Sequence, residues 1–142
     1  MKQKTLIYWA VTAPMAALML LSAAPDLLQV PLAVSIFGHL GYPTYLLPFL
    51  GVAKTLGVVT VLFSPFPRLK EWAYAGLLFD VTGALYSHLS VGDPGSAWAP
   101  AAVAIGLISG SYLTHRVRLS ANGILRAPRV TDATVSGRSA AW

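Results

Sequence analysis

Long apolar stretches, separated by short polar or proline-rich breaks, follow one another through the first 115 residues of the chain. Their predicted bounds are Leu6 to Ala24, Pro43 to Phe63, Glu71 to Leu89 and Pro100 to Thr114. A helix needs about 20 apolar residues to cross the hydrocarbon core of a bilayer, and the first three stretches come close to that length. The pattern therefore predicts an all-α, polytopic membrane protein built as a bundle of four transmembrane helices.

The first stretch admits a second interpretation, because Ser22 and Ala24 have the spacing of a signal-peptide cleavage site. The apolar run is longer than the roughly 7 to 15 residues usual for such a peptide, however. Pro25 also directly follows the candidate site. We therefore favour a first helix that is retained.

The positions of the basic residues predict the orientation. Before the carboxyl-terminal region, the bases outside the apolar stretches are Lys2, Lys4, Arg68 and Lys70. The first and third connections contain no Lys or Arg. Since cytoplasmic loops carry the excess of bases, both termini and the middle connection are predicted to be cytoplasmic. The first connection, Pro25 to Tyr42, is too apolar for a solvated loop, and we expect an interfacial or re-entrant segment on the outer face.

Composition agrees with a membrane protein and excludes several functions. Hydrophobic residues make up 56% of the chain and charged ones only 11%, which is too apolar for a small soluble domain. The formal charge of +5 does not indicate nucleic-acid binding, because the bases lie at chain ends and between apolar stretches. The absence of cysteine removes disulfides and cysteine-ligated metal centres, and no metal site is expected.

The carboxyl-terminal region differs in composition from the rest. After His115, which we interpret as a cation at a helix end, arginines alternate with Ser, Thr, Ala and Gly. Such a segment has too few apolar residues to form a core. We therefore divide the chain into a membrane domain, residues 1–115, and a basic disordered cytoplasmic tail, residues 116–142.

A lysine and an aspartate interrupt two of the apolar stretches. At about 1.5 Å per residue, Asp80 lies roughly 13 Å along the helix from Glu71, near the centre of a bilayer. An ionised carboxylate there costs about 3 kcal/mol, so it needs a partner, a proton or a function. Lys54 lies about as far before the break at Ser64 and Pro65. Two antiparallel helices joined there would bring Lys54 and Asp80 to the same depth, as an ion pair or a neutral hydrogen-bonded pair.

The role of this pair stays open between a structural clamp and part of a proton or ligand site. Small residues surround Asp80 at helical spacing, and we expect their face to pack closely inside the bundle; they are Gly76, Gly83, Ala84 and Ser87. Tyr86, Ser87 and His88 lie one to two turns outward, which would give a polar track from the outer face to Asp80. The alternative is an ordinary interfacial Tyr and His.

Other chemistry has weaker support in the sequence. His39 and His88 are both expected near the outer face and could be axial ligands of a haem, but no CxxCH motif is present. The chain contains no Gly-rich phosphate loop, no HExxH and no GxSxG. Whether the protein is an enzyme therefore stays open.

Two strings of the sequence, His39 to Gly57 and Leu69 to Leu89, contain the pieces LGYP, GVAK, KEWAYAG and GALYSH. In these pieces the chain resembles the DoxX-like family of small bacterial membrane proteins. With the flanking helices, the resemblance covers roughly Leu6 to Leu113. It implies a four-helix bundle in the bacterial inner membrane, with both ends cytoplasmic.

The resemblance implies less about activity. The family takes its name from a membrane subunit associated with an archaeal quinone-linked oxidase, and other relatives are linked to oxidative-stress complexes or, in animals, to receptor assembly. We therefore expect an accessory subunit of a membrane complex, with lipid and a partner subunit or a second copy around it. Quinone is the candidate cofactor, with Asp80, Tyr86 and His88 as its polar contacts. The alternatives are a non-catalytic scaffold or assembly factor and, less favoured, a small-solute transporter.

Overall fold

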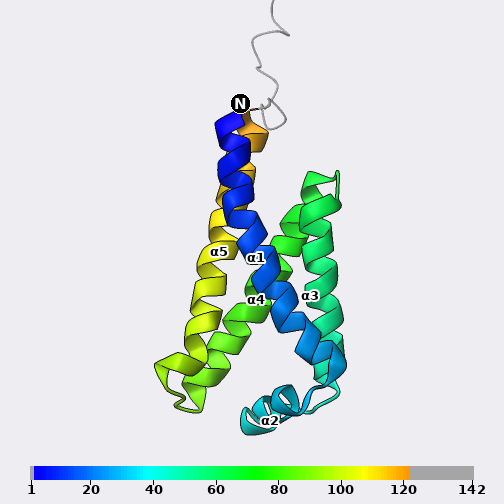
Figure 1. The fold of residues 1–142 in the computed structure, drawn as a ribbon, viewed down its shortest axis with the longest axis vertical. Helices are drawn as coiled ribbons and strands as arrows, with labels where there is room; N and C mark the ends of the chain where they lie inside the picture. The colour runs from blue at the N-terminus through cyan, green and yellow to red at the C-terminus, as the bar shows by residue number, and fades with distance from the viewer. Residues whose placement is uncertain (1, 122–142) are drawn as a thin grey trace, which may run out of the picture.

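The computed structural model describes residues 2–121, which fold into helices without a strand. The five helices are α1 (Lys2–Leu28), α2 (Pro31–His39), α3 (Leu46–Phe63), α4 (Pro67–Ser90) and α5 (Gly95–Ala121). The four long helices form a closed ring in the order α1, α3, α4, α5, each packed on the next and α5 packed on α1. Successive long helices run antiparallel, and the short α2 lies across one end of the bundle (Figure 1). The predicted all-α class is confirmed.

The two ends of the bundle differ in charge. The start of α1, the α3–α4 connection and the end of α5 lie at one end, and α2 and the α4–α5 connection lie at the other (Figure 1). We call the first the basic end, because it holds Lys4, Arg68, Lys70, Arg116 and Arg118. The opposite end holds two histidines and one aspartate, His39, His88 and Asp93, and we call it the α2 end.

Helix α1 continues past the point where the sequence analysis ends it. Pro25 lies inside the helix, which reaches Leu28 and stops where Gln29 adopts a φ of 49°. A proline inside a helix removes one backbone hydrogen bond, and neighbouring helices can make this tolerable in a membrane protein. Asp26 is therefore part of α1, and the predicted connection shortens to a turn followed by α2.

The other helix bounds differ by a few residues. Helix α3 begins at Leu46, after a turn in which the Leu46 amide donates to the Pro43 carbonyl at 3.1 Å. Pro48 falls in its first turn, where the missing amide removes no helical hydrogen bond. Helix α4 begins at Pro67, because proline suits the first position of a helix.

Helix α5 is longer than predicted at both ends, running from Gly95 with Pro100 inside it to Ala121. His115 and residues 116–121 thus belong to its last turns. The remainder of the predicted tail, residues 122–142, lies outside the described residues, so the domain boundary stays a prediction.

Three of the described helices are long and apolar enough to cross a membrane by length and composition: α1 over Gln3–Leu28, α3 over Leu46–Phe63 and α5 over Gly95–Ser120. Helix α4 is not among them, and it carries Arg68, Lys70, Glu71 and Asp80. It packs between α3 and α5 and runs along them (Figure 1). The chain therefore has the character of a multi-pass membrane protein, and the fourth crossing, by α4, stays a prediction.

The centre of the bundle is a compact apolar core. Met15, Met19, Val58, Val61 and Ile108 are at most 1% exposed, and Leu77 of α4 fills the space between them. Toward the basic end, this core gives way to buried hydroxyls. Ser111 lies 2.7 Å from Thr12 and 2.8 Å from Tyr74, joining α1, α4 and α5.

Candidate functional site

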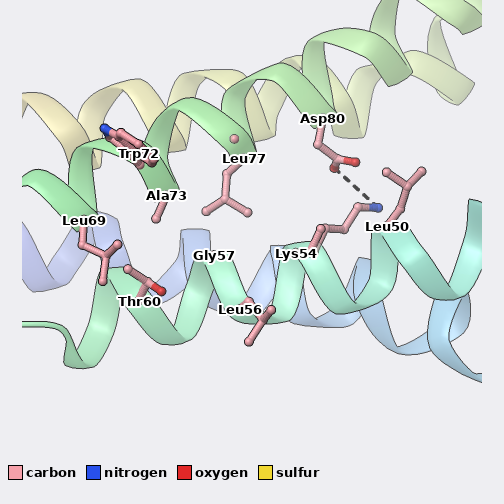
Figure 2. A pocket seen from close by; sticks show the side chains of 12 residues that line it. Leu50, Lys54, Leu56, Gly57, Thr60, Leu69, Trp72, Ala73, Leu77 and Asp80 are labelled. Carbon is pink, nitrogen blue, oxygen red and sulfur yellow. Dashed lines mark ion pairs between the residues drawn. The ribbon is translucent and has the colours of Figure 1, made fainter.

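Lys54 of α3 meets two carboxylates instead of one. Its Nζ donates a 2.8 Å hydrogen bond to Asp26 Oδ2 and a 3.0 Å hydrogen bond to Ser22 Oγ, both on α1. The same Nζ lies 3.6 Å from Asp80 Oδ2 on α4. Figure 2 shows Lys54 and Asp80 pointing toward each other across the space between α3 and α4. The structure thus brings together the two residues that the sequence pairs, and adds Asp26.

Asp26 was missed because Pro25 predicts the end of the first helix. With α1 continued to Leu28, Asp26 lies in its last turn and is 7% exposed. A carboxylate at the carboxyl end of a helix is disfavoured by the helix dipole, so Asp26 needs the Lys54 ammonium. A signal was present in the sequence, since Ser22 and Asp26 share one helical face at i and i+4.

The cluster Asp26, Lys54 and Asp80, which we call the charged triad, holds two acids and one base. Their side chains are 10%, 12% and 17% exposed. With all three groups ionised the triad would carry one excess negative charge within an apolar bundle, where an uncompensated charge is costly. The triad therefore favours a bound proton, or a ligand that donates hydrogen bonds or carries positive charge.

Asp80 is the member that is open to such a ligand. The distance of 3.6 Å to Lys54 exceeds hydrogen-bond range, so the contact is ionic only. Asp80 also lines two cavities between α3 and α4, of about 450 Å³ and about 300 Å³. Its carboxylate can therefore accept a hydrogen bond from a molecule in either one.

The two cavities share Leu50, Lys54 and Asp80, and together we call them the α3–α4 groove. The first extends from the triad toward the basic end, past Gly57, Trp72 and Gly76 (Figure 2). The second extends toward the α2 end and is lined by Phe37 of α2 and by Leu40, Tyr42, Gly83 and Ser87. Apart from the triad, the groove is largely apolar and is covered by α2 at one end.

The glycines of α4 make this space, contrary to the close packing that the sequence predicts for them. A Cβ atom at Gly76 or Gly83 would meet nothing within 4 Å. The close approaches occur at glycines of α3, where a Cβ at Gly51 would lie 2.7 Å from the Leu27 side chain. A Cβ at Gly57 would lie 2.9 Å from the Leu77 side chain. Small residues thus join α3 to its neighbours and leave the Asp80 face of α4 open.

The residues of the predicted polar track lie apart from the triad. Tyr86 is 72% exposed. Ser87 pairs with Tyr42, with 2.8 Å between the hydroxyl oxygens. The two histidines meet on Asp93, with 2.7 Å between His39 Nε2 and Asp93 Oδ1 and 2.6 Å between His88 Nδ1 and Asp93 Oδ2. Of these residues, Ser87 lines the groove.

The histidine cluster holds α2 against the α4–α5 connection. The hydrogen bonds from His88 and then His39 hold the pKa of the Asp93 carboxyl below its usual range. Within residues 2–121, no group of three or more His, Cys, Asp or Glu side chains has the arrangement of a metal site. Both imidazoles point a nitrogen at Asp93, which gives them a structural role at the α2 end.

The burial of His115, near the basic end, was not predicted, because the sequence indicates a cation at a helix end. His115 is 6% exposed instead of capping a helix in solvent, and its ring lies 6.0 Å from the rings of Tyr8 and Tyr74. Its Nε2 is buried and has no hydrogen-bond partner in the described part of the chain. The extension of α5 beyond Thr114 accounts for this, since it carries His115 into the contact with α1 and α4.

Comparison with known proteins gives one family. The model of the DoxX-like family matches residues 10–122, which includes the whole of α2 to α5 and most of α1. No curated protein and no solved structure gives a significant match to the chain. The resemblance carried by LGYP, GVAK, KEWAYAG and GALYSH is therefore confirmed, and it continues to the end of α5.

Proposed function

Because the chain belongs to the DoxX-like family of membrane proteins, we propose that it is an accessory subunit of a membrane complex and binds a quinone in the α3–α4 groove. The observation that supports this most directly is the charged triad, whose Asp80 faces a largely apolar groove and has no hydrogen-bonded partner among residues 2–121. In a bacterial inner membrane, with both termini cytoplasmic, this groove would be reached from the lipid.

The size and lining of the groove fit such a molecule. Small-molecule sites are clefts of roughly 300 to 1,000 Å³, mostly apolar with a few polar groups, and the two cavities fall at the lower end of that range. Leu50, Leu56 and Leu77 would contact an apolar chain, and the glycines of α4 leave room for a planar ring. A bound quinone would supply two-electron, two-proton redox chemistry to the complex.

The triad matches the polar end of the ligand. Lys54 can donate to a carbonyl oxygen, and the Asp80 carboxylate can accept from a hydroxyl. The excess acid of the triad favours the hydroxyl-bearing quinol over the quinone. Of the three contacts predicted from the sequence, Asp80 lines this space, whereas Tyr86 is exposed and His88 binds Asp93.

A non-catalytic scaffold is the second candidate, and the open glycines favour it. Gly76 and Gly83 leave a face of α4 on which the backbone of a partner's helix could approach closely, as small residues permit in membranes. The transporter alternative has less support. The buried core of Met15, Met19 and Ile108 fills the bundle beside the triad, whereas a solute path needs polar side chains along it.

The quinone proposal is tested by extraction. Protein purified in mild detergent or native lipid should carry quinone or quinol that organic solvent releases, measured by mass spectrometry against the protein concentration. Asp80→Asn, which keeps the size of the side chain, should reduce the bound amount by at least about tenfold, the loss expected when one charge-assisted hydrogen bond is removed.

Glu71→Gln is the matched control, because it also neutralises an acid of α4 but outside the α3–α4 groove. It should leave the bound quinone unchanged. A wild-type protein without quinone contradicts the proposal. The scaffold gains support if the same preparation contains a defined partner protein whose binding is lost in Gly76→Leu and Gly83→Leu.

A further inference from the structure

A second apolar groove lies between α4 and α5, on a different face of α4. It has a volume of about 320 Å³ and is lined by Ala75 and Leu78 of α4 and by Ile108, Ser109 and Leu113 of α5. The two grooves are lined by different residues of α4. Ala75 and Leu78 line this one, whereas Gly76 and Leu77 line the α3–α4 groove. The two grooves are therefore separate, and what occupies one does not depend on the other.

The end of this groove nearest the basic end carries polar side chains. Glu71 and Tyr112 line it there, and Arg116 of α5 binds both. Its Nη1 donates to the Tyr112 hydroxyl at 3.0 Å and lies 3.8 Å from Glu71 Oε1. The Arg116 side chain is 49% exposed, so the guanidinium is fixed at the mouth and still offers donors outward.

A second arginine, Arg68, is found on α4 one turn before Glu71, outside the residues that line the groove. Arg68 lies three residues before Glu71, so both project from one face of the helix. Arg68 is exposed and has no ion-pair partner among residues 2–121. Two arginines and one glutamate at the mouth leave a net charge of +1, beside a groove of apolar side chains.

We infer that the α4–α5 groove binds an anionic phospholipid, with an acyl chain along Ala75 and Leu78 and the phosphate between Arg68 and Arg116. The charge of the mouth complements a phosphodiester, and a guanidinium can hold two phosphate oxygens at once. Basic pockets between transmembrane helices on the cytoplasmic side are sites of this kind. A zwitterionic lipid would place its cationic group against the same arginines and bind less tightly.

The test is lipid binding to the purified full chain in detergent, counted by native mass spectrometry. Phosphatidylglycerol and phosphatidylcholine with the same acyl chains are the probes. Phosphatidylglycerol should bind the wild-type protein at least about tenfold more tightly. Arg116→Gln and Arg68→Gln should each weaken its binding about fivefold, the effect of one basic residue near an anionic headgroup.

Arg118→Gln is the matched control, because it removes the same charge from the basic end at another place. Arg118 lies over the Tyr8 ring of α1, with its Cζ 4.5 Å from the ring centre. Its loss should leave phosphatidylglycerol binding unchanged. Equal weakening by Arg118→Gln and Arg116→Gln would show diffuse attraction to the basic end and overturn the site.

The groove itself is tested by filling it. Ala75 is exposed on α4, so Ala75→Leu adds volume to the groove without entering the core. It should weaken phosphatidylglycerol binding while both arginines remain, and Ser109→Leu on the facing helix should do the same. Unchanged binding in both variants, or equal binding of the two lipids by the wild-type protein, contradicts the inference.

Discussion

A lysine inside an apolar bundle needs acceptors for its ammonium protons, and Lys54 finds two of them on α1. Its hydrogen bonds go to Ser22 and Asp26 of α1, whereas Asp80 of α4 attracts it at longer range. The three helices are thus held together by a single side chain. The two acids have different roles. Asp26 accepts a hydrogen bond from Lys54, whereas Asp80 accepts none from it and can accept one from a molecule in the groove.

This difference predicts unequal effects of neutralising the two acids. Asp26→Asn should lower the stability by about 2 kcal/mol, because it leaves a buried ammonium without its hydrogen-bonded counterion. Asp80→Asn should cost less than about 1 kcal/mol, because the longer contact is weaker and the change also removes the excess charge. The measurement is the thermal midpoint of each variant in detergent. A larger loss for Asp80→Asn would mean that Lys54 depends chiefly on Asp80.

At the residue scale, the sequence was informative where charge is rare. Two interrupting charges at matching distances from one connection are enough to place Lys54 near Asp80. Asp26 was out of reach because proline usually ends a helix, and here packing of α1 against α3 sustains the helix through Pro25. The contact of His39 with Asp93 was equally hidden, since it joins residues 54 positions apart and depends on where α2 lies.

Among the elements, α2 has the fewest attachments and the clearest relation to the groove. Phe37 and Leu40 line the cavity of the α3–α4 groove that lies nearer the α2 end. Side-chain hydrogen bonds of His39 and Tyr42 hold α2 and the residues after it in place. Ligand entry past α2 would require those two bonds to open. Helix α2 therefore has the position of a cover whose attachment depends in part on an ionised carboxylate.

The attachment of α2 should weaken in acid. Because the pKa of Asp93 is lowered in the folded protein, its contribution is present above the ordinary carboxyl pKa of about 4 and is lost as the pH falls through the lowered value. Hydrogen exchange of residues 31–39, corrected for the intrinsic rate, should rise several-fold below about pH 4.

Asp93→Asn should give rapid exchange of α2 already at pH 6, with little further change in acid. Tyr42→Phe removes the bond to Ser87 and should speed exchange without altering its dependence on pH. If α2 exchanges equally in the wild-type protein and Asp93→Asn, the histidine cluster does not hold it.

Helix α4 shows why the number of crossings is harder to predict than the fold. It does not qualify as a membrane helix by length and composition, although it is 24 residues long. Two contacts hold α4 against its neighbours: Asp80 pairs with Lys54, and Leu77 packs in the core. Neither contact can be read from the sequence of α4 alone. By length and composition α1, α3 and α5 qualify as membrane helices. The apolar pattern predicts α4 as well, but its composition alone does not qualify it.

For the whole molecule, the strongest feature is the separation of charge between the two ends. Within residues 2–121 every Lys and Arg except Lys54 lies at the basic end, and this favours a cytoplasmic position for that end. The fold is consistent with this because an even number of long helices returns the end of α5 to the side where α1 begins (Figure 1).

The absence of cysteine makes the orientation easy to measure. Ser64→Cys places a thiol in the α3–α4 connection, and Ser96→Cys places one near the start of α5 at the α2 end. In intact spheroplasts, a membrane-impermeant maleimide should label Ser96→Cys and should reach Ser64→Cys after the membrane is opened. The reverse pattern would invert the proposed topology and move the phospholipid site to the outer leaflet.

The empty space beside Gly76 and Gly83 has a consequence for how such proteins diversify. Both glycines line a cavity, and a Cβ atom at either position would meet nothing within 4 Å. An alanine could therefore replace each glycine without displacing a neighbouring helix. Substitutions at these two positions of α4 can therefore change the width of the α3–α4 groove, while the residues that pack the helices together stay the same. If the groove binds a ligand as proposed, the residues that set its size differ from those that hold the helices together.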